Sequence, residues 1–160
     1  MLLTNYIYDE LEIGQSATLE HVITEHDIQS FAAISHDVNP AHLDKEYAAG
    51  TIFKDVIAHG MLSGAYISAV LGTKLPGPGT IYLNQELSFL KPVYIGSTIS
   101  VTLTVIEKLP KNRVILECKC VNQKDELVCS GVAKVLAPVK KIEVEVKSLL
   151  SIAVSFKEEK

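Results

Sequence analysis

The strongest constraint on the fold is an uncharged stretch from Val56 to Thr73, VIAHGMLSGAYISAVLGT, which contains no Asp, Glu, Lys or Arg. From Met61 onward its apolar residues recur at helical spacing and leave no polar face, so we predict a helix that is buried all round. Three glycines, two serines, a threonine and a histidine make the stretch too polar for a membrane span. The rest of the chain must therefore cover this helix.

His59 and Gly60 stand in the predicted first turn of this helix. Backbone N–H groups at a helix start have no partner inside the helix, and the helix dipole is positive there. The start of the buried helix is thus suited to hold a developing negative charge.

Composition limits the class of protein. The 160 residues suffice for one domain with a real core, and 48% hydrophobic with 21% charged residues indicates a globular chain. A formal net charge of −4 argues against a general nucleic-acid or membrane-surface binder. The three cysteines lack metal-ligand spacing, and the first residues lack a signal-peptide pattern, so we expect reduced thiols and a cytoplasmic protein.

Most of the remaining chain alternates as strands do. We predict a short helix from Thr24 to Ile34 and five strands, at residues 16–23, 80–90, 97–107, 113–121 and 127–136. Short polar turns join the last three strands into an antiparallel meander. One buried helix and such a sheet predict an α+β fold in which a curved antiparallel sheet wraps a central helix. Because the sheet covers one side of the helix only, we expect a homodimer or a higher homo-oligomer.

The pattern weakens after residue 137. We therefore assign residues 1–137 to one domain and residues 138–160 to a C-terminal appendage or tail. Within it, residues 142–146 alternate, and an apolar patch with Leu149 and Leu150 follows.

The loop from Ser35 to His42, SHDVNPAH, is dense in hydrogen-bonding groups. Its proline forbids a simple helix through Asn39. Asp37 and Asn39 are ordinary residues of Asx-type turns, so a purely structural loop is one interpretation.

Together with His59-Gly60-Met61-Leu62, this loop resembles the MaoC-like, R-specific enoyl-CoA hydratases of the hot-dog fold. The resemblance covers residues 10 to 137 and includes the later Ile81-Tyr82-Leu83 and Leu87-Ser88-Phe89. Two positions depart from the family pattern. His36 replaces the usual glycine, where it could narrow the acyl channel, alter the surroundings of Asp37 or point into solvent, and Ala41 is smaller than the usual aliphatic residue.

The resemblance implies reversible hydration of a trans-2-enoyl-CoA to an R-3-hydroxyacyl-CoA. Water must lose a proton as it attacks C3, C2 must gain one, and the thioester oxygen must be stabilised. By the resemblance, Asp37 and His42 are the acid–base pair, with the division of roles left open, and the N–H of Gly60 is the oxyanion donor.

Other residues have supporting roles by the same resemblance. Asn39 fixes the loop or orients the catalytic pair, and Ser68 matches a serine that supports the catalytic aspartate. We expect His59, Met61 and Lys91 at the substrate site, His59 in a structural role. Lys91 or Lys74 would meet the phosphates of CoA.

The substrate is expected to be an acyl-CoA thioester, with CoA part of the substrate and no separate cofactor, because hydration changes no oxidation state. The five histidines show no metal-binding spacing, so no metal is expected. Two alternatives remain: a hot-dog thioesterase using the same oxyanion donor, and a non-catalytic acyl-thioester binding or dimerisation module.

Overall fold

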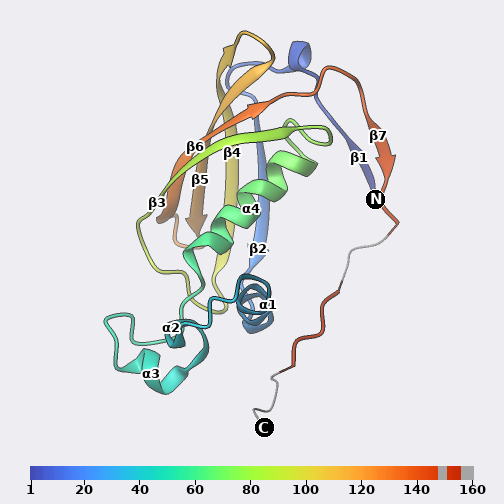
Figure 1. The fold of residues 1–160 in the computed structure, drawn as a ribbon. Helices are drawn as coiled ribbons and strands as arrows, with labels where there is room; N and C mark the ends of the chain where they lie inside the picture. Colours follow the sequence, from blue (N-terminus) through green and yellow to red (C-terminus); the bar gives the residue numbers. More distant parts are fainter. Residues whose placement is uncertain (148–150, 156–160) are drawn as a thin grey trace.

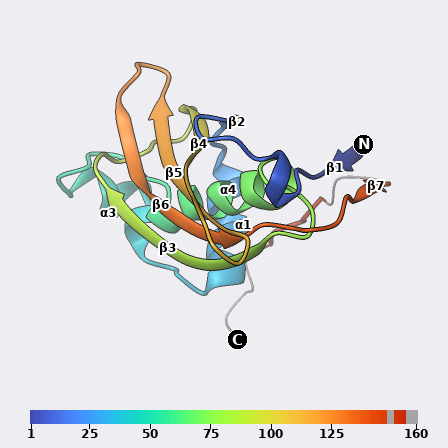
Figure 2. The ribbon, with the colours of Figure 1, turned by 90° about the horizontal axis from the view of Figure 1, so that it is seen from above.

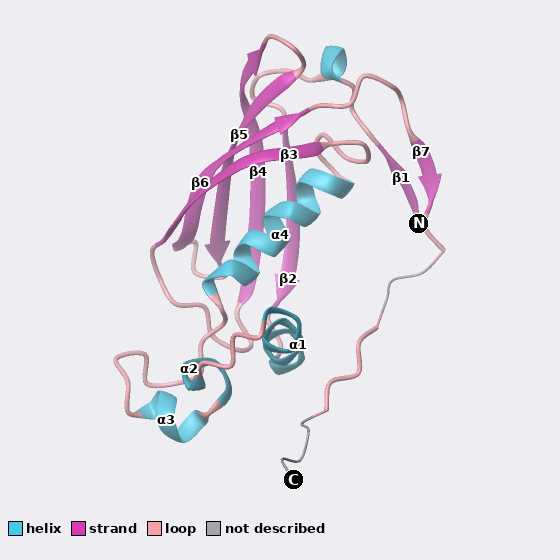
Figure 3. Ribbon diagram, viewed as in Figure 1, coloured by secondary structure: helices cyan, strands magenta, loops and turns pink. Residues whose placement is uncertain are grey.

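The computed structural model describes residues 1–147 and 151–155. Its centre is an antiparallel sheet that curves around helix α4 (Gly60–Thr73), as seen from above in Figure 2. The strand order is β2-β4-β5-β6-β3, with bounds β2 Ser16–Val22, β3 Ile81–Phe89, β4 Thr98–Leu109, β5 Arg113–Asn122 and β6 Leu127–Leu136. Figure 3 shows α4 lying along the concave side of these strands. The predicted α+β hot-dog architecture and the β4-β5-β6 meander are confirmed.

The core lies between α4 and the inner face of the sheet. From residue 99 to 105 of β4 and from residue 114 to 120 of β5, every second residue is buried, while the residues between are partly or fully exposed. This is the alternation expected of strands with one face on a core. The fully buried members of the two strands include Val101, Leu103, Val105, Val114, Leu116, Cys118 and Cys120.

Part of the prediction for the central helix was wrong. The helix begins at Gly60, which confirms the predicted first turn at His59 and Gly60, but residues 56–58 of the uncharged stretch lie outside it. Backbone hydrogen bonds from Ile57 N–H to the Ala41 carbonyl (3.2 Å) and from Ala58 N–H to the Val93 carbonyl (2.7 Å) hold the preceding residues in an extended path. The helix is also not buried all round, since Met61 is 57% exposed.

Three short helices gather at the end of the sheet where α4 begins (Figure 1). They are α1 (Glu25–Ser35), α2 (Pro40–Leu43) and α3 (Lys45–Ala49). Each is preceded by a residue whose side chain accepts hydrogen bonds from the free N–H groups of the first turn, namely Thr24, Asn39 and Asp44. The loop that was predicted to be chemically active therefore lies next to the start of α4.

The two terminal segments meet at the opposite end of the molecule. Strand β1 (Leu2–Thr4) pairs with β7 (Glu143–Glu145), and the short helix η1 (Tyr8–Glu10) follows β1. The side chain of Asn5, only 1% exposed, bonds the Pro78 carbonyl, the Lys140 carbonyl and the Ile142 N–H. These contacts attach residues 140–145 to the N-terminal segment, whereas Leu149 and Leu150 lie outside the described residues. None of the described helices is long and apolar enough to cross a membrane.

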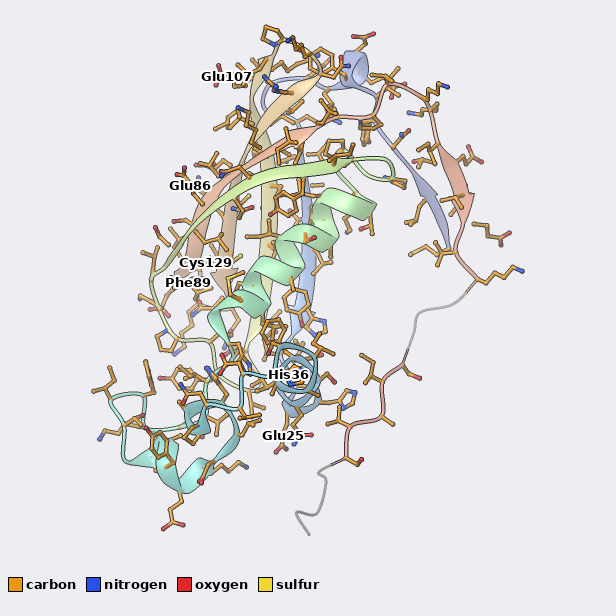
Figure 4. The ribbon with its side chains drawn as sticks, viewed as in Figure 1. Glu25, His36, Glu86, Phe89, Glu107 and Cys129 are labelled. Carbon is orange, nitrogen blue, oxygen red and sulfur yellow. The ribbon has the colours of Figure 1, made fainter. Side chains whose placement is uncertain are left out.

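His36 ends α1 in the left-handed backbone conformation, with φ of 62°. That conformation costs a side-chain-bearing residue about 1 to 2 kcal/mol, which explains why glycine suits the position. The side chain of His36 is exposed, so of the three interpretations the structure supports a side chain in solvent (Figure 4).

Replacing His36 by glycine is expected to raise the free energy of unfolding by about 0.5 to 1 kcal/mol. The relief of backbone strain exceeds the extra chain entropy of glycine in the unfolded state. Urea unfolding followed by circular dichroism measures the change. His36→Ala, which keeps the strain, serves as the control, and a glycine variant no more stable than this alanine variant would contradict the explanation.

Candidate active site

The ring of His42 is oriented by a hydrogen bond to the backbone. It lies in α2, and its Nδ1 is 2.8 Å from the backbone carbonyl of Ile57. Because a carbonyl oxygen can only accept, Nδ1 must carry the proton. The Nε2 atom of neutral His42 therefore keeps its lone pair, which makes it a candidate proton acceptor.

His59 ties the loop to the start of α4. Its Nε2 donates to the backbone carbonyl of Asp37 over 2.9 Å, and its side chain is almost fully buried. Burial lowers the pKa of His59, and the nearby His42 lowers it further, while the bond to the Asp37 carbonyl acts in the opposite direction. His59 is therefore neutral near pH 7, with a bare Nδ1 that finds no hydrogen-bond partner in the described structure.

Asp37 and Asn39 form two successive Asx-type turns. The Asp37 carboxylate accepts from the Asn39 N–H at 3.2 Å, and the Asn39 side chain accepts from the Ala41 N–H at 3.0 Å. The hydrogen bonds expected if this loop had a purely structural role are thus present. They leave one carboxylate oxygen of Asp37 without a bond to the described residues, on an exposed side chain.

The three side chains converge. One carboxylate oxygen of Asp37 and one ring nitrogen of each of His42 and His59 lie within 4.8 Å of one another. Such a set has the composition of a metal site. However, the two imidazole rings stack, with centroids 3.9 Å apart and planes tilted by 31°. The in-plane lone pairs of two stacked rings do not converge on one point, so the arrangement does not suit tetrahedral coordination of one ion by both rings.

A pocket of about 370 Å³ opens beside this cluster. His42, His59, Gly60 and Ser63 contribute to it, and Lys91 stands among the exposed residues of its lining. The other walls are apolar: Phe53, Ile57, Ala58, Phe89, Leu90, Pro92, Val93 and Val128. The pocket therefore joins a mostly apolar chamber to a few polar groups, as small-molecule sites do.

Gly60 begins α4 with free backbone donors. Its N–H has no hydrogen-bond partner in the described part of the chain. A Cβ placed on Gly60 would lie 3.1 Å from two ring carbons of Phe89, so only glycine fits here without displacing that ring. Phe89 ends β3 on the side where α4 begins (Figure 4).

Not all predicted site residues come together. Met61 lies in a separate pocket with Gly64 and Leu87. Ser68 is exposed on α4, about 12 Å along the axis from Gly60, and no hydrogen bond joins it to Asp37 in the described chain. Lys91 is at the pocket, where its Nζ pairs with Glu126 at 2.6 Å.

Two contributors were missed from sequence. The Ile57 carbonyl, which fixes the tautomer of His42, has no sequence signal because it belongs to the backbone. Ser63 lines the pocket and is 7% exposed. Its spacing of three residues from Gly60 places both on one helix face, and this could have indicated it.

Comparison with known families matches residues 10–127 to the MaoC like domain. The chain therefore belongs to the MaoC-like family, in agreement with its hot-dog fold and with the loop that faces the start of α4.

Individual relatives agree with this assignment. The chain is 46% identical over 137 residues to an (R)-specific enoyl-CoA hydratase of Rhodospirillum rubrum, covering 86% of this chain and 94% of that protein. Among solved structures, the R-hydratase PhaJ1 of Pseudomonas aeruginosa has a TM-score of 0.92 at 51% identity, covering 97% of this chain and all (100%) of that chain. The (R)-hydratase of Aeromonas caviae has a TM-score of 0.78 at 40% identity, covering 80% and 98%.

Proposed function

We propose that this chain is an (R)-specific enoyl-CoA hydratase in which Asp37 and His42 are the acid–base pair. It is a hydro-lyase that reversibly adds water to a trans-2-enoyl-CoA to give an (R)-3-hydroxyacyl-CoA. The observation that carries the site is the convergence of the Asp37 carboxylate with the His42 ring beside a pocket. The similarity to (R)-specific hydratases over most of the chain supports the reaction.

The geometry suggests how the steps proceed. A water held between the free Asp37 oxygen and Nε2 of His42 loses a proton to this pair as its oxygen attacks C3. The pair returns a proton to C2, so that one water is added overall. His59 keeps the backbone of Asp37 in place through its Nε2–H. Because hydration changes no oxidation state, the reaction needs no redox cofactor, and CoA is part of the substrate.

The thioester oxygen becomes enolate-like when C3 is attacked. The unpartnered N–H of Gly60 at the start of α4 can bind that oxygen, and the helix dipole favours the charge. The absence of a side chain on Gly60 lets the carbonyl approach the backbone.

The test is the loss of conjugated enoyl-thioester absorbance when the purified protein meets crotonyl-CoA, with chiral analysis of the product. Loss of absorbance with formation of the R-alcohol is expected. Release of free thiol would instead indicate a thioesterase, and binding of crotonyl-CoA without turnover would indicate a binding module. Either result would reject the hydratase.

We infer that Lys91, an exposed residue of the pocket lining, binds the phosphates of CoA. Replacing Lys91 by alanine is expected to raise KM for crotonyl-CoA about fivefold, the effect of losing one partly exposed charge pair. KM for crotonyl-N-acetylcysteamine, which has no phosphates, should not change. Lys74→Ala is the control, because Lys74 donates to the Thr18 carbonyl at 2.7 Å and does not line this pocket. Equal changes in KM for both substrates would contradict a role of Lys91 in binding the phosphates.

The exposed side of α4 and the edge strand β3 together form a surface suited to a second copy of the chain. Met61 is 57% exposed, and Leu83 and Phe89 of β3 are 46% and 52% exposed. An unpaired strand edge next to an apolar helix face is a surface that proteins commonly cover. We expect a homodimer in light scattering after gel filtration, and Leu83→Lys should shift it toward monomer. A wild-type monomer would contradict the proposal.

A cytoplasmic location fits the state of the thiols. Cys118, Cys120 and Cys129 are all free and buried. Unpaired thiols are typical of proteins in a reducing compartment.

A further inference from the structure

The pocket beside the catalytic cluster contains the hydroxyl of a largely buried serine, to which the mechanism above gives no role. Ser63 is 7% exposed and belongs to the pocket lining. The other polar side chains of the lining are His42, His59 and Lys91, so Ser63 supplies its only hydroxyl. A polar group in such an apolar chamber calls for a partner.

The hydroxyl of Ser63 does not make the backbone hydrogen bond that Ser35 and Thr73 make in these helices. Ser35 donates to the Phe31 carbonyl at 2.6 Å, and Thr73 donates to the Ala69 carbonyl at 2.6 Å. Both are the usual bonds to the residue four positions earlier. In the described structure Ser63 makes no such bond to the His59 carbonyl and no other side-chain hydrogen bond. Its hydroxyl therefore remains available to a ligand in the pocket.

Helix geometry brings this hydroxyl toward Gly60. Residues three apart share one helix face, and Ser63 lies about 4.5 Å along the axis from Gly60. Side chains of a helix lean toward its N-terminus, so the hydroxyl of Ser63 covers the turn that Gly60 begins. The unpartnered N–H of Gly60 and the unpartnered O–H of Ser63 thus face one region of the pocket.

We propose that the Ser63 hydroxyl is a second hydrogen-bond donor to the substrate thioester oxygen, acting beside the Gly60 N–H. The inference rests on the hydratase function and names a further catalytic residue for it. No proton is transferred: Ser63 keeps its hydrogen and donates a bond that strengthens as the oxygen gains charge. Because the bond is stronger in the transition state than in the bound substrate, it acts on kcat more than on KM.

The first test compares Ser63→Ala with wild type in the crotonyl-CoA assay. Loss of one of two donors is expected to lower kcat about 10- to 100-fold, with KM within about twofold. Ser63→Thr, which keeps a hydroxyl, should recover most of the activity. Ser100→Ala, which removes an exposed hydroxyl on β4 that bonds Glu20, should leave kcat unchanged. A wild-type kcat in Ser63→Ala, or a change confined to KM, overturns the proposal.

A stability measurement excludes a merely structural role. The hydroxyl has no protein partner to lose, so Ser63→Ala should unfold at the same urea concentration as wild type. A clear loss of stability in Ser63→Ala would show that the hydroxyl supports the fold, and would overturn the proposal.

A second readout does not need turnover. Acetoacetyl-CoA forms a stable enolate with its own absorbance, and donors to the thioester oxygen should raise the enolate fraction of the bound ligand. Wild type is expected to show more bound enolate than Ser63→Ala, and equal fractions overturn the proposal. If wild type fails to hydrate crotonyl-CoA, the hydratase function fails, while the enolate spectrum still decides whether Ser63 contacts the oxygen.

Discussion

Replacing Asp37 or His42 by asparagine is expected to lower kcat for crotonyl-CoA hydration by about 10³-fold in each case, since positioned acid–base groups contribute about 10² to 10⁴. In His42→Asn the introduced amide would still present an N–H where Nδ1 of His42 donates to the Ile57 carbonyl. The amide would lack the lone pair of Nε2. The loop should therefore stay in place while proton transfer is lost, and binding of crotonyl-CoA should persist.

The control is a histidine that has no place in the cluster. His26 is exposed on α1 beside Ser30, so His26→Asn should retain full activity. The double variant of Asp37 and His42 is expected to be little worse than either single one, because groups that act as a unit are not additive. Hydration that survives in either single variant would show that the pair is misassigned, even if the reaction is correct.

Sequence reasoning identified the residues of the loop but not how they are oriented. Asp37 and His42 lie five positions apart around a proline, and that spacing is visible in the chain. The tautomer of His42 depends on the Ile57 carbonyl, and the neutral state of His59 depends on burial and on His42. Both are set by tertiary contacts, which a local pattern does not contain.

Hydrophobicity predicted the central helix, and His59 with Gly60 was correctly placed at its start, but the uncharged stretch alone does not show that its first residues lie outside the helix. The residues before Gly60 are as apolar as the helix itself, yet they bond Ala41 and Val93 instead of continuing the helix. Periodicity cannot separate a buried extended segment from a buried helix when both lack charge. The strands were predicted more accurately because alternation reports directly on a sheet with one buried face.

Position 131 requires glycine for a reason that the sequence pattern of its own strand does not reveal. It lies inside β6, opposite Leu87 of β3, and its φ is not among the positive values. A Cβ at this position would lie 1.9 Å from the Glu86 carbonyl oxygen and 2.9 Å from the carbonyl carbon. Because both contacts are to backbone, no side-chain rotation relieves them. Glycine is therefore required here because the backbone of β3 lies too close to admit a Cβ. Glycines inside strands often mark such a close approach.

Gly131→Ala is expected to lower the free energy of unfolding by about 3 kcal/mol, because β3 must separate from β6 and lose ladder bonds to admit one methyl group. Urea unfolding followed by circular dichroism measures the loss. Gly72→Ala in α4 is the matched control: nothing lies within 4 Å of its added Cβ, and alanine should stabilise the helix by up to about 1 kcal/mol. A free energy of unfolding for Gly131→Ala within about 0.5 kcal/mol of wild type is the range of an ordinary surface substitution. That result would contradict the close approach of β3 to β6 at this position. Phe89 of β3 packs against Gly60. Moving β3 away from β6 should therefore shift Phe89 and lower hydration activity, because the N–H of Gly60 is the proposed oxyanion donor.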